Sequence, residues 1–256
     1  MYGLSHMREP NIRQCDMRLR VLCRHYSLVY SLCIVFGGKK GEVRMKTYEK
    51  IETLYKRDME GTKKLVPGVY RNDTIEFLKD NTWVWTEKID GTNIRVLWDG
   101  HSVTFGGRTE RASIPAHLVN RLNELFGGEQ NAQVFEQMFG EREVMLFGEG
   151  YGAKIQNGGN YIPDGVDFIM FDLFINDNYQ SRENMECCAK ALGVKVVPIV
   201  GEGTLDEAVA FVKGHPKSTI GNAEMEGLVC RPAVELRDRC GNRVIVKIKW
   251  NDFKDE

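Results

Sequence analysis

The sequence predicts an α+β fold built mainly from antiparallel strands. Segments with strand-like patterns outnumber helical segments, and most neighbouring strands are joined by turns short enough for hairpins. Parallel strands would need more helical crossovers than this sequence offers, which disfavours a doubly wound sheet. The chain has 256 residues, of which 42% are hydrophobic and 28% are charged. This composition is typical of a soluble globular protein, and the length is sufficient for a buried core.

The first half of the chain contains most of the clear strand patterns. Residues 82–89 are rich in aromatic and β-branched side chains, as strands are. Residues 93–98 and 102–105 alternate between apolar and polar, and the Asp-Gly pair between them predicts a hairpin. Two further apolar strands are expected at 143–147 and 167–175. The Gly- and Asn-rich segment from 150 to 164 is expected to be a mobile or ligand-ordered loop.

Helical spacing of apolar residues predicts helices at 48–55, 114–126 and 182–192. Thr204 and Glu207 form the pattern of a capping box, which predicts a helix from there through Val212. The remaining expected strands are 194–200, 226–231, 233–238 and 243–250, the last two joined by a turn at Gly241-Asn242.

Residues 1–44 differ from the rest of the chain. They carry eight Lys or Arg against three Asp or Glu, a net charge of +5. Because the net charge of the whole chain is −1, the other residues carry −6. The apolar run at 26–36 is about half of the roughly 20 residues that a membrane span needs, and no signal-peptidase pattern follows it. Purine-rich codons for residues 40–43 would resemble a ribosome-binding site. We therefore hypothesise that the natural start is Met45, that residues 1–44 are a disordered or non-native extension, and that 45–256 form one domain. Finding Met1 by N-terminal sequencing of the natural protein would refute this.

One lysine stands where a covalent intermediate can form. Residues 86–93 read Thr-Glu-Lys-Ile-Asp-Gly-Thr-Asn, so Lys88 lies two residues before an Asp-Gly turn at the end of a strand. A deprotonated lysine at such a position suits a covalent nucleotidyl-enzyme. A charged edge strand closed by a turn has the same pattern, so this motif alone does not decide between the two.

Other candidates lie further along the chain. The period of two in the last strand places Lys247 and Lys249 on one face, where they bind anions or simply protect an edge strand from aggregation. There are four more candidates, three at strand ends and one, Phe171, within an expected strand, and each alone is more often a turn, surface or core residue. They are Arg108 in Gly-Gly-Arg-Thr, Glu149 in Phe-Gly-Glu-Gly, Phe171 in Phe-Asp, and Glu226 in Met-Glu-Gly-Leu-Val.

Taken in order, these motifs resemble those of the covalent lysine nucleotidyltransferases, the superfamily of polynucleotide ligases and messenger-RNA capping enzymes. The sequence segments 86–93 and 148–156 are most similar to those of the phage-type RNA ligase family. The resemblance covers residues 46–250. It implies a nucleotidyltransferase (ligase adenylation) domain, in which antiparallel β-sheets flank a nucleotide groove and helices lie on the outside.

The resemblance also implies a role for each matching residue. Lys88 would form a phosphoramidate with AMP, while Lys247 and Lys249 would bind the phosphates and assist catalysis. Glu226 would help to hold Mg²⁺ (or Mn²⁺). The other residues expected to contact the nucleotide are Glu87, Asp90 in a slot that varies among RNA ligases, Gly91, Asn93 (orienting the reacting ends), Arg108 (ribose or RNA end), Glu149 (ribose) and Phe171 (adenine).

The function implied is that of an ATP-dependent RNA ligase, which joins a 3′-hydroxyl to a 5′-phosphate through lysyl-AMP and an adenylated RNA 5′ end. The expected cofactors are ATP and Mg²⁺, and the expected partners are RNA ends. Because ligases of this type often carry a C-terminal accessory domain, which is expected to be absent here, an accessory protein is expected to assist RNA binding. The protein is expected in the cytoplasm, that of the host if a phage encodes it, and away from membranes. The alternatives are a DNA ligase, a capping guanylyltransferase, or a non-catalytic module that binds RNA ends.

Overall fold

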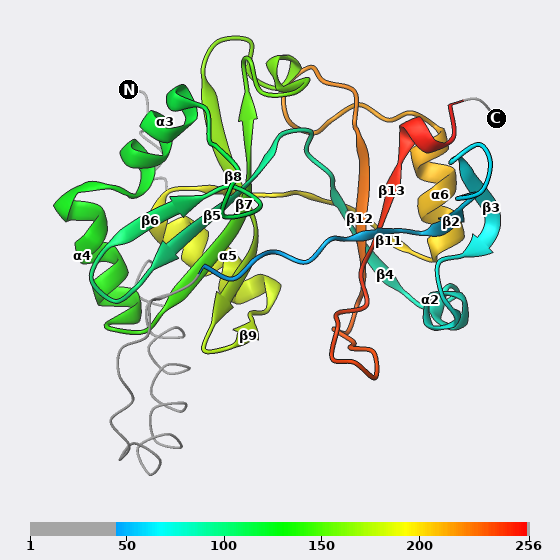
Figure 1. The fold of residues 1–256 in the computed structure, drawn as a ribbon, viewed down its shortest axis with the longest axis horizontal. Coiled ribbons are helices and arrows are strands. Elements are labelled where there is room, and N and C mark those ends of the chain that lie inside the picture. The colour runs from blue at the N-terminus through cyan, green and yellow to red at the C-terminus, as the bar shows by residue number, and fades with distance from the viewer. Residues whose placement is uncertain (1–44, 255–256) are drawn as a thin grey trace, which may run out of the picture.

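Two β-sheets lie side by side in the computed structural model, which describes residues 45–254 (Figure 1). The predictions for residues 1–44 therefore lie outside the described residues. One sheet has five strands in the order β1-β13-β12-β4-β11, and the other has the order β10-β8-β7-β5-β6 with β9 beside β8. All pairs are antiparallel except β1 with β13 and β10 with β8. The predicted α+β class with mainly antiparallel sheets is thus confirmed.

The strands of these sheets are β1 (Glu52–Thr53), β4 (Trp83–Glu87), β5 (Thr92–Trp98), β6 (Val103–Gly106), β7 (Val144–Gly152), β8 (Val166–Ile175), β9 (Asn178–Tyr179), β10 (Lys195–Val196), β11 (Ile199–Gly203), β12 (Gly227–Pro232) and β13 (Val246–Lys249). The hairpin of β2 (Tyr55–Arg57) and β3 (Leu65–Tyr70) stands apart from them. The helices are α2 (Asp73–Leu78), α3 (Ala116–Phe126), α4 (Gly128–Phe139), α5 (Arg182–Leu192) and α6 (Leu205–Lys213), and two short 3₁₀ turns lie at 158–160 and 250–252.

Each sheet has its own hydrophobic core. Helices α3, α4 and α5 cover the six-stranded sheet, where Phe126, Phe135 and Phe168 are completely buried. Helices α2 and α6 cover the five-stranded sheet around Trp83. None of the helices in residues 45–254 combines the length and the apolarity that a membrane span needs. The molecule therefore consists of two packed halves, and any site between them draws residues from both.

Several predicted elements are confirmed closely. The hairpin of β5 and β6 pairs Trp98 with Val103 across the predicted Asp-Gly turn. Helix α5 occupies 182–192 as predicted and ends at Gly193. The capping box of α6 is formed by Thr204 and Glu207, each accepting a hydrogen bond from the other's backbone. In these cases the local signal and the fold agree.

Three predictions about elements were wrong, and one helix was not predicted. Residues 48–55 are extended rather than helical, because β1 pairs with β13 and this tertiary pairing overrides the helical spacing. The strand predicted at 194–200 is divided into β10 and β11 around Pro198, which has no N–H for a ladder. Residues 233–238 form no strand and make only the single bridge between Arg237 and Arg243. Helix α3 ends at Phe126 with Gly127 as its C-cap, in agreement with the predicted end at 126, but the helix α4 that follows was not predicted.

The segment 150–164 is more tightly packed than expected. Strand β7 continues to Gly152, and both Ile155 and Tyr161 are buried. The Asp90 backbone N–H donates to the Tyr161 hydroxyl at 3.2 Å, and Asn157 donates to the Asp90 carboxylate at 2.7 Å. These contacts fix the segment against residues at the predicted site, which argues against a freely mobile loop.

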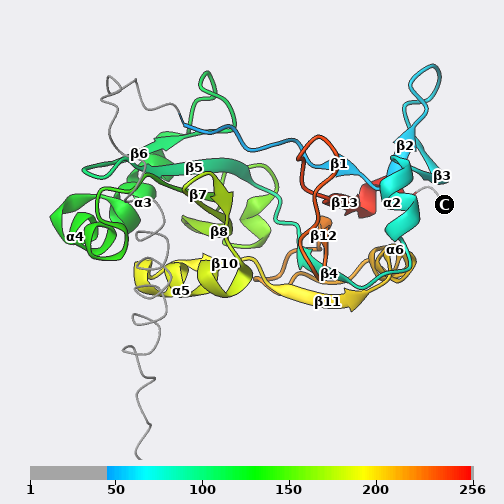
Figure 2. The same cartoon turned by 90° about the horizontal axis from the view of Figure 1, so that it is seen from below.

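Residues 45–51 cross from one sheet to the other, and we call this segment the strap. In Figure 2 it runs over the two sheets on the side opposite to α5 and α6. At one end the buried Arg95 donates to the carbonyl oxygens of Met45 (3.0 Å) and Lys46 (3.4 Å). At the other end the strap continues into β1, on the edge of the five-stranded sheet. The strap thus adds a third connection between the two halves, beside the chain from β4 to β5 and the chain from β10 to β11.

Candidate active site

A pocket of about 380 Å³ lies between the two sheets, and most residues singled out from the sequence line it. The six-stranded sheet contributes Asn93, Glu149 and Phe171. Strand β13, in the five-stranded sheet, contributes Lys247 and Lys249. The other predicted residues at the pocket are Glu87, Lys88, Asp90, Gly91, Arg108 and Glu226. The structure therefore brings together residues that are dispersed over most of the described chain.

The position of Lys88 follows from how β4 meets β12. The Lys88 backbone N–H donates to the carbonyl oxygen of Gly227 at 2.9 Å, which places Lys88 beside Glu226. Gly227 has a φ of +152° and packs so closely on β13 that a Cβ would collide with the Ile248 carbonyl oxygen. A glycine is therefore required directly after Glu226.

A second glycine allows the other sheet to approach. A Cβ at Gly91 would collide with the carbonyl oxygen of Gly150 and would lie 2.9 Å from Cγ of Glu149. The Asp-Gly turn after Lys88 therefore lies directly against the strand that carries Glu149. Both glycines of the motifs are explained by close approach of backbone at the pocket.

The carboxylate of Glu226 is shared by two lysines. Its Oε2 lies 2.5 Å from Nζ of Lys88, and its Oε1 lies 2.5 Å from Nζ of Lys249. Lys247, by contrast, forms no ion pair within residues 45–254. The pKa of Lys247 is lowered by burial first, and then by the positive charges of Lys249 and Lys88. Lys247 is thus a cation placed in the pocket without a partner, which is the arrangement expected of an anion site.

Glu149 is a second carboxyl group in the pocket, and burial raises its pKa to about 8. The charge of Lys88 opposes this shift, while the nearby Glu226 and Asp90 add to it. Asn93 lies directly opposite Glu149 on β5, and its buried Oδ1 has no hydrogen-bond partner among the described residues. Buried polar groups in native proteins are normally satisfied. This pair therefore indicates that a polar ligand completes the site.

The other predicted residues, Arg108, Phe171 and Asp90, differ in their exposure and in their contacts. Arg108 is exposed at the rim, where its charge lowers the pKa of Glu149. Phe171 presents part of its ring to the pocket and packs edge-on against Tyr48, with 4.9 Å between ring centroids. The Asp90 carboxylate accepts from Asn157, as described above.

Glu87 was expected to contact the nucleotide, but its side chain points elsewhere. Its carboxylate accepts hydrogen bonds from the Ser218 hydroxyl, the Thr219 hydroxyl (2.6 Å) and the Thr219 backbone N–H (3.0 Å). Because alternate residues of a strand face opposite sides, Thr86 faces the pocket and Glu87 faces away from it. The carboxylate of Glu87 therefore organises the turn at 218–219, and only its backbone remains for a ligand.

A divalent metal ion fits this pocket only together with a ligand that brings its own oxygen atoms. No group of three or more His, Cys, Asp or Glu side chains in residues 45–254 has the arrangement of a metal site. Mg²⁺ is commonly held by one or two carboxylates plus substrate phosphates, and Glu226 with Glu149 nearby meets that requirement. The donor set is therefore compatible with Mg²⁺ or Mn²⁺ bound jointly with phosphates.

Tyr48 and Arg231 are among the pocket-lining residues that sequence reasoning missed. Tyr48 was assigned to a helix, which concealed its position in the strap. Arg231 lies two positions after Val229 on β12, so the two side chains share the face that lines the pocket. The sequence alone does not show which face of this strand turns toward the pocket, so Arg231 could not be placed there.

Comparison with known proteins gives a consistent result. The sequence model described as RNA ligase matches residues 81–249. A mutant of Naegleria gruberi RNA ligase with ATP and Mn is similar to this chain at 20% identity and a TM-score of 0.53, covering 72% of this chain and 54% of that one. An apo mutant of the same enzyme gives 19% identity and a TM-score of 0.57, covering 86% of this chain and 62% of that one. The chain thus spans between about half and two thirds of the length of these structures.

Proposed function

Because the chain belongs to the RNA ligase family, we propose that it is an ATP-dependent RNA ligase that works through a covalent lysyl-AMP intermediate on Lys88. Within this proposal the fold is that of a nucleotidyltransferase domain, and the pocket between the sheets is its nucleotide groove. The substrates are ATP and RNA ends that carry a 5′-phosphate and a 3′-hydroxyl. A cytoplasmic location and an accessory protein for RNA binding belong to the same proposal.

The observation that carries the proposal is the convergence of Lys88, Glu149, Glu226, Lys247 and Lys249 on one pocket. Glu149 lies on β7 and both Lys247 and Lys249 lie on β13, in two different sheets, while Lys88 directly follows β4 and Glu226 directly precedes β12. A charged residue with a purely structural role needs only a local partner. These residues instead share one cavity, in which Lys247 has no ion pair among the described residues and the Asn93 Oδ1 has no hydrogen-bond partner among them. Such a collection of perturbed and unpaired groups is typical of active sites.

In the first step Nζ of Lys88 attacks the α-phosphorus of ATP, a nitrogen–phosphorus bond forms, and pyrophosphate leaves. Before the attack Lys88 has to separate from Glu226 and lose its proton, because an ammonium is not a nucleophile. The Lys88 side chain is 24% exposed, so the proton can pass to solvent once this ion pair opens. Lys247 and Lys249 face the same cavity and would stabilise the negative charge of the phosphates.

In the later steps AMP moves from Lys88 to the 5′-phosphate of RNA, and the 3′-hydroxyl then displaces AMP to close the backbone. Asn93 and Arg108, which line the pocket, would orient the reacting ends. When Mg²⁺ is bound, Glu226 and the substrate phosphates would hold it, and it would supply positive charge where negative charge develops.

Intact-mass spectrometry tests the proposal directly. The protein is incubated with Mg²⁺ and either ATP or GTP, and we expect a gain of one AMP from ATP, located on Lys88 by peptide mapping. Lys88→Ala should show no gain. Lys195→Ala is the matched control, since Lys195 also pairs with a carboxylate but lies outside the pocket, and it should gain AMP normally. A gain of GMP would identify a capping-type enzyme instead, and no gain with either nucleotide would favour a binding module.

A further inference from the structure

One buried carboxylate connects the two halves of the molecule. Asp172 on β8 is only 1% exposed. It accepts hydrogen bonds from Arg231 on β12 (2.8 and 3.1 Å), from Arg243 (2.9 and 3.3 Å) and from the Tyr48 hydroxyl (2.5 Å). Tyr48 belongs to the strap, and Arg243 precedes β13. We call these four residues the latch, because they bring the strap and both sheets to one point.

The backbone of β8 is adapted to this contact. Its pairing with β7 is interrupted between Phe147 and Gly148, which oppose Asp172 and Met170, so Phe171 is the extra residue of a β-bulge. A bulge changes the direction of the side chains around it. Here it places Phe171 at the pocket while its neighbour Asp172 is buried in the latch.

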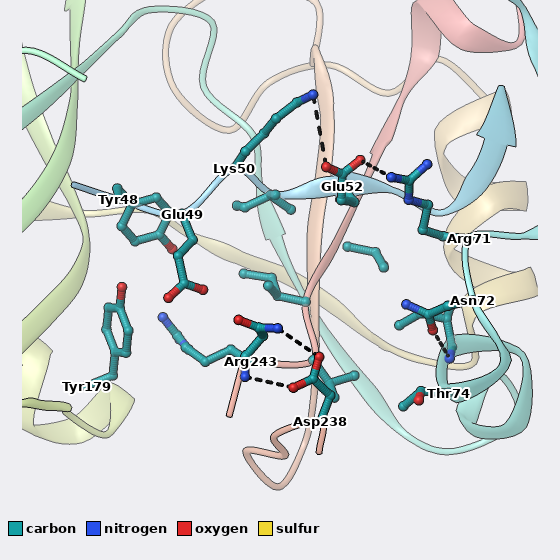
Figure 3. A pocket seen from close by; sticks show the side chains of 16 residues that line it. Tyr48, Glu49, Lys50, Glu52, Arg71, Asn72, Thr74, Tyr179, Asp238 and Arg243 are labelled. Atoms are coloured by element: carbon teal, nitrogen blue, oxygen red, sulfur yellow. Dashed lines mark hydrogen bonds and ion pairs between the residues drawn. The ribbon is translucent and has the colours of Figure 1, made fainter. Parts of the chain in front are cut away.

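The strap depends on the latch for its position. Tyr48 is the only buried residue in residues 45–52. The strap residues Tyr48, Glu49 and Ile51 line both the pocket described above and a second pocket of about 390 Å³. Figure 3 shows Tyr48 and Glu49 at the edge of this second pocket, with Tyr179 and Arg243 nearby. The strap packs through Met45, Tyr48 and Ile51 against a small apolar cluster, and Tyr48 also ties it to the latch through its hydroxyl.

The latch also contacts the wall of the first pocket. The ring of Tyr48 packs against Phe171, and Arg231 donates to the Phe171 carbonyl oxygen at 3.4 Å. Arg231 itself lines the pocket, and its buried Nε has no partner among the residues that the structure describes. Movement of the latch would therefore move both a ring and a cation that face the pocket.

A second ion cluster on the same strand provides a comparison. Asp167, also on β8, lies 3.3 Å from Arg121 and 3.2 Å from Lys195. Both partners belong to the half that contains the six-stranded sheet, and none of the three residues lines the pocket. The two clusters have the same composition of one carboxylate and two cations, but only the latch joins the halves.

We propose that Tyr48 and Asp172 are positioning residues for nucleotide binding, because they hold the wall formed by Phe171 and Arg231 at a fixed distance from the lysines of the opposite sheet. This inference rests on the function proposed above. Neither residue needs to contact the nucleotide. Buried ion pairs are weak evidence of stabilisation by themselves, since apolar residues often stabilise a core equally well. The latch differs in that it sets the relative position of two separately packed halves.

The test compares Tyr48→Phe, Asp172→Asn and the control Asp167→Asn. For each variant, the rate of AMP attachment is measured by intact mass over a range of ATP concentrations, and the unfolding temperature is recorded with and without ATP. Loss of a hydrogen bond to a charged group corresponds to a change of about tenfold, so we expect the KM for ATP to rise about tenfold in Tyr48→Phe. Asp172→Asn should raise it further, and Asp167→Asn should leave it within about twofold of the wild-type value. The rate at saturating ATP should change much less than KM.

A purely structural latch would lower the unfolding temperature without changing the KM for ATP. An unchanged KM in folded Tyr48→Phe would therefore overturn the inference, whatever happens to stability. Should Asp172→Asn fail to fold, Tyr48→Phe decides the question alone, because it removes a single hydroxyl. An equal rise of KM in Asp167→Asn would also overturn it, since any loss of an ion cluster would then have the same effect. If the wild-type protein takes up no nucleotide, the proposed function fails first, and the inference fails with it.

Discussion

Asp172 and Glu149 lie in neighbouring strands of the same sheet, and their surroundings shift their pKa values in opposite directions. Burial alone would raise the pKa of Asp172, but the charges of Arg231 and Arg243 outweigh it, and the pKa is lowered. Burial raises the pKa of Glu149 to about 8, and the charge of Lys88 offsets only part of that rise. The Asp172 carboxylate accepts hydrogen bonds from Tyr48, Arg231 and Arg243, whereas Glu149 has no comparable set of partners among the described residues.

This difference in hydrogen bonding separates a carboxylate with a structural role from one that is suited to bind a ligand. A buried charge that is fully hydrogen-bonded is already complete, and a ligand could only disturb it. A buried carboxyl group without such partners lowers the stability of the free protein and can be compensated when a ligand arrives. The latch is therefore assigned to positioning, and the Glu149 region is assigned to recognition. The following experiments test that division.

The largest effect is expected from Lys88→Ala in the joining of RNA with ATP. Removal of a covalent nucleophile should reduce joining by about a thousandfold or more, because no other side chain replaces it. Given RNA that already carries a 5′-adenylate, the same variant should still seal it measurably with Mg²⁺. Gel analysis of both reactions measures the two steps separately. Full ATP-dependent joining by Lys88→Ala would show that another residue is the nucleophile.

Glu226→Ala should impair both reactions, in contrast to Lys88→Ala. This carboxylate contacts Lys88 and Lys249, and its loss changes the charge of the pocket in every step. Loss of one electrostatic group of this kind typically costs about a hundredfold in rate. The same two gel assays measure it, with Asp167→Asn as the control. Sealing of adenylated RNA at the wild-type rate would limit Glu226 to the first step.

Glu149→Gln should stabilise the free protein at alkaline pH. The pKa of Glu149 rises on folding from its ordinary value of 4.5 to about 8. Between these pH values the folded state binds a proton that the unfolded state lacks, so the contribution of Glu149 to stability falls as pH increases. The penalty is absent at pH 4 and complete at pH 9. We expect the variant to unfold about 3 °C or more above the wild type at pH 9, and at the same temperature at pH 4.

Asp172→Asn provides the opposite case in the same measurement. Because the pKa of Asp172 is lowered in the folded protein, its stabilising contribution is present above the unfolded pKa and is lost as pH falls through the folded one. The variant should therefore be less stable than the wild type at neutral pH, and the difference should shrink in acid. If both variants changed stability in the same direction with pH, the division between the two carboxyl groups would be wrong.

The smallest effect is expected from Lys154→Ala. Lys154 is exposed on the loop that Asn157 and Tyr161 fix to Asp90, and it does not line the pocket. An exposed lysine of this kind should change joining by less than about twofold. A larger loss, together with a weaker dependence of joining on salt, would show that the loop contacts RNA phosphate.

Much of the fold was predictable where the signals are local. The Asp-Gly hairpin, the capping box and the Gly193 stop depend on residues close together in the sequence, and all three are present in the structure. The chemistry of the pocket was predictable in part, since a lysine before Asp-Gly and two lysines on an apolar strand are unusual patterns. That these residues would meet at one site was expected only from the order of the motifs. The pocket shows that they do meet, because the fold brings their strands together.

What escaped prediction depends on contacts between distant residues. Tyr48 has helical spacing with its neighbours, but its hydroxyl finds a carboxylate on β8 and its backbone remains extended. Arg231 resembles any arginine at the end of a strand until Asp172 is placed next to it. The direction of Glu87 was fixed by Ser218 and Thr219, which no local pattern connects with it. In each case the position of a polar side chain is determined by a hydrogen-bond or ion-pair partner that is far away in the sequence.

The parallel pairing of β1 with β13 has a consequence for how the protein is made. These two strands are separated by almost the whole described chain, yet the backbone of Thr53 lies beside Lys247. Pairings between distant segments form late because they close long loops, and they slow folding. During synthesis β1 leaves the ribosome long before its partner exists, and its edge must wait unpaired. A nascent chain that lacks β13 therefore has neither Lys247 nor Lys249, and it cannot assemble the pocket before β13 is translated.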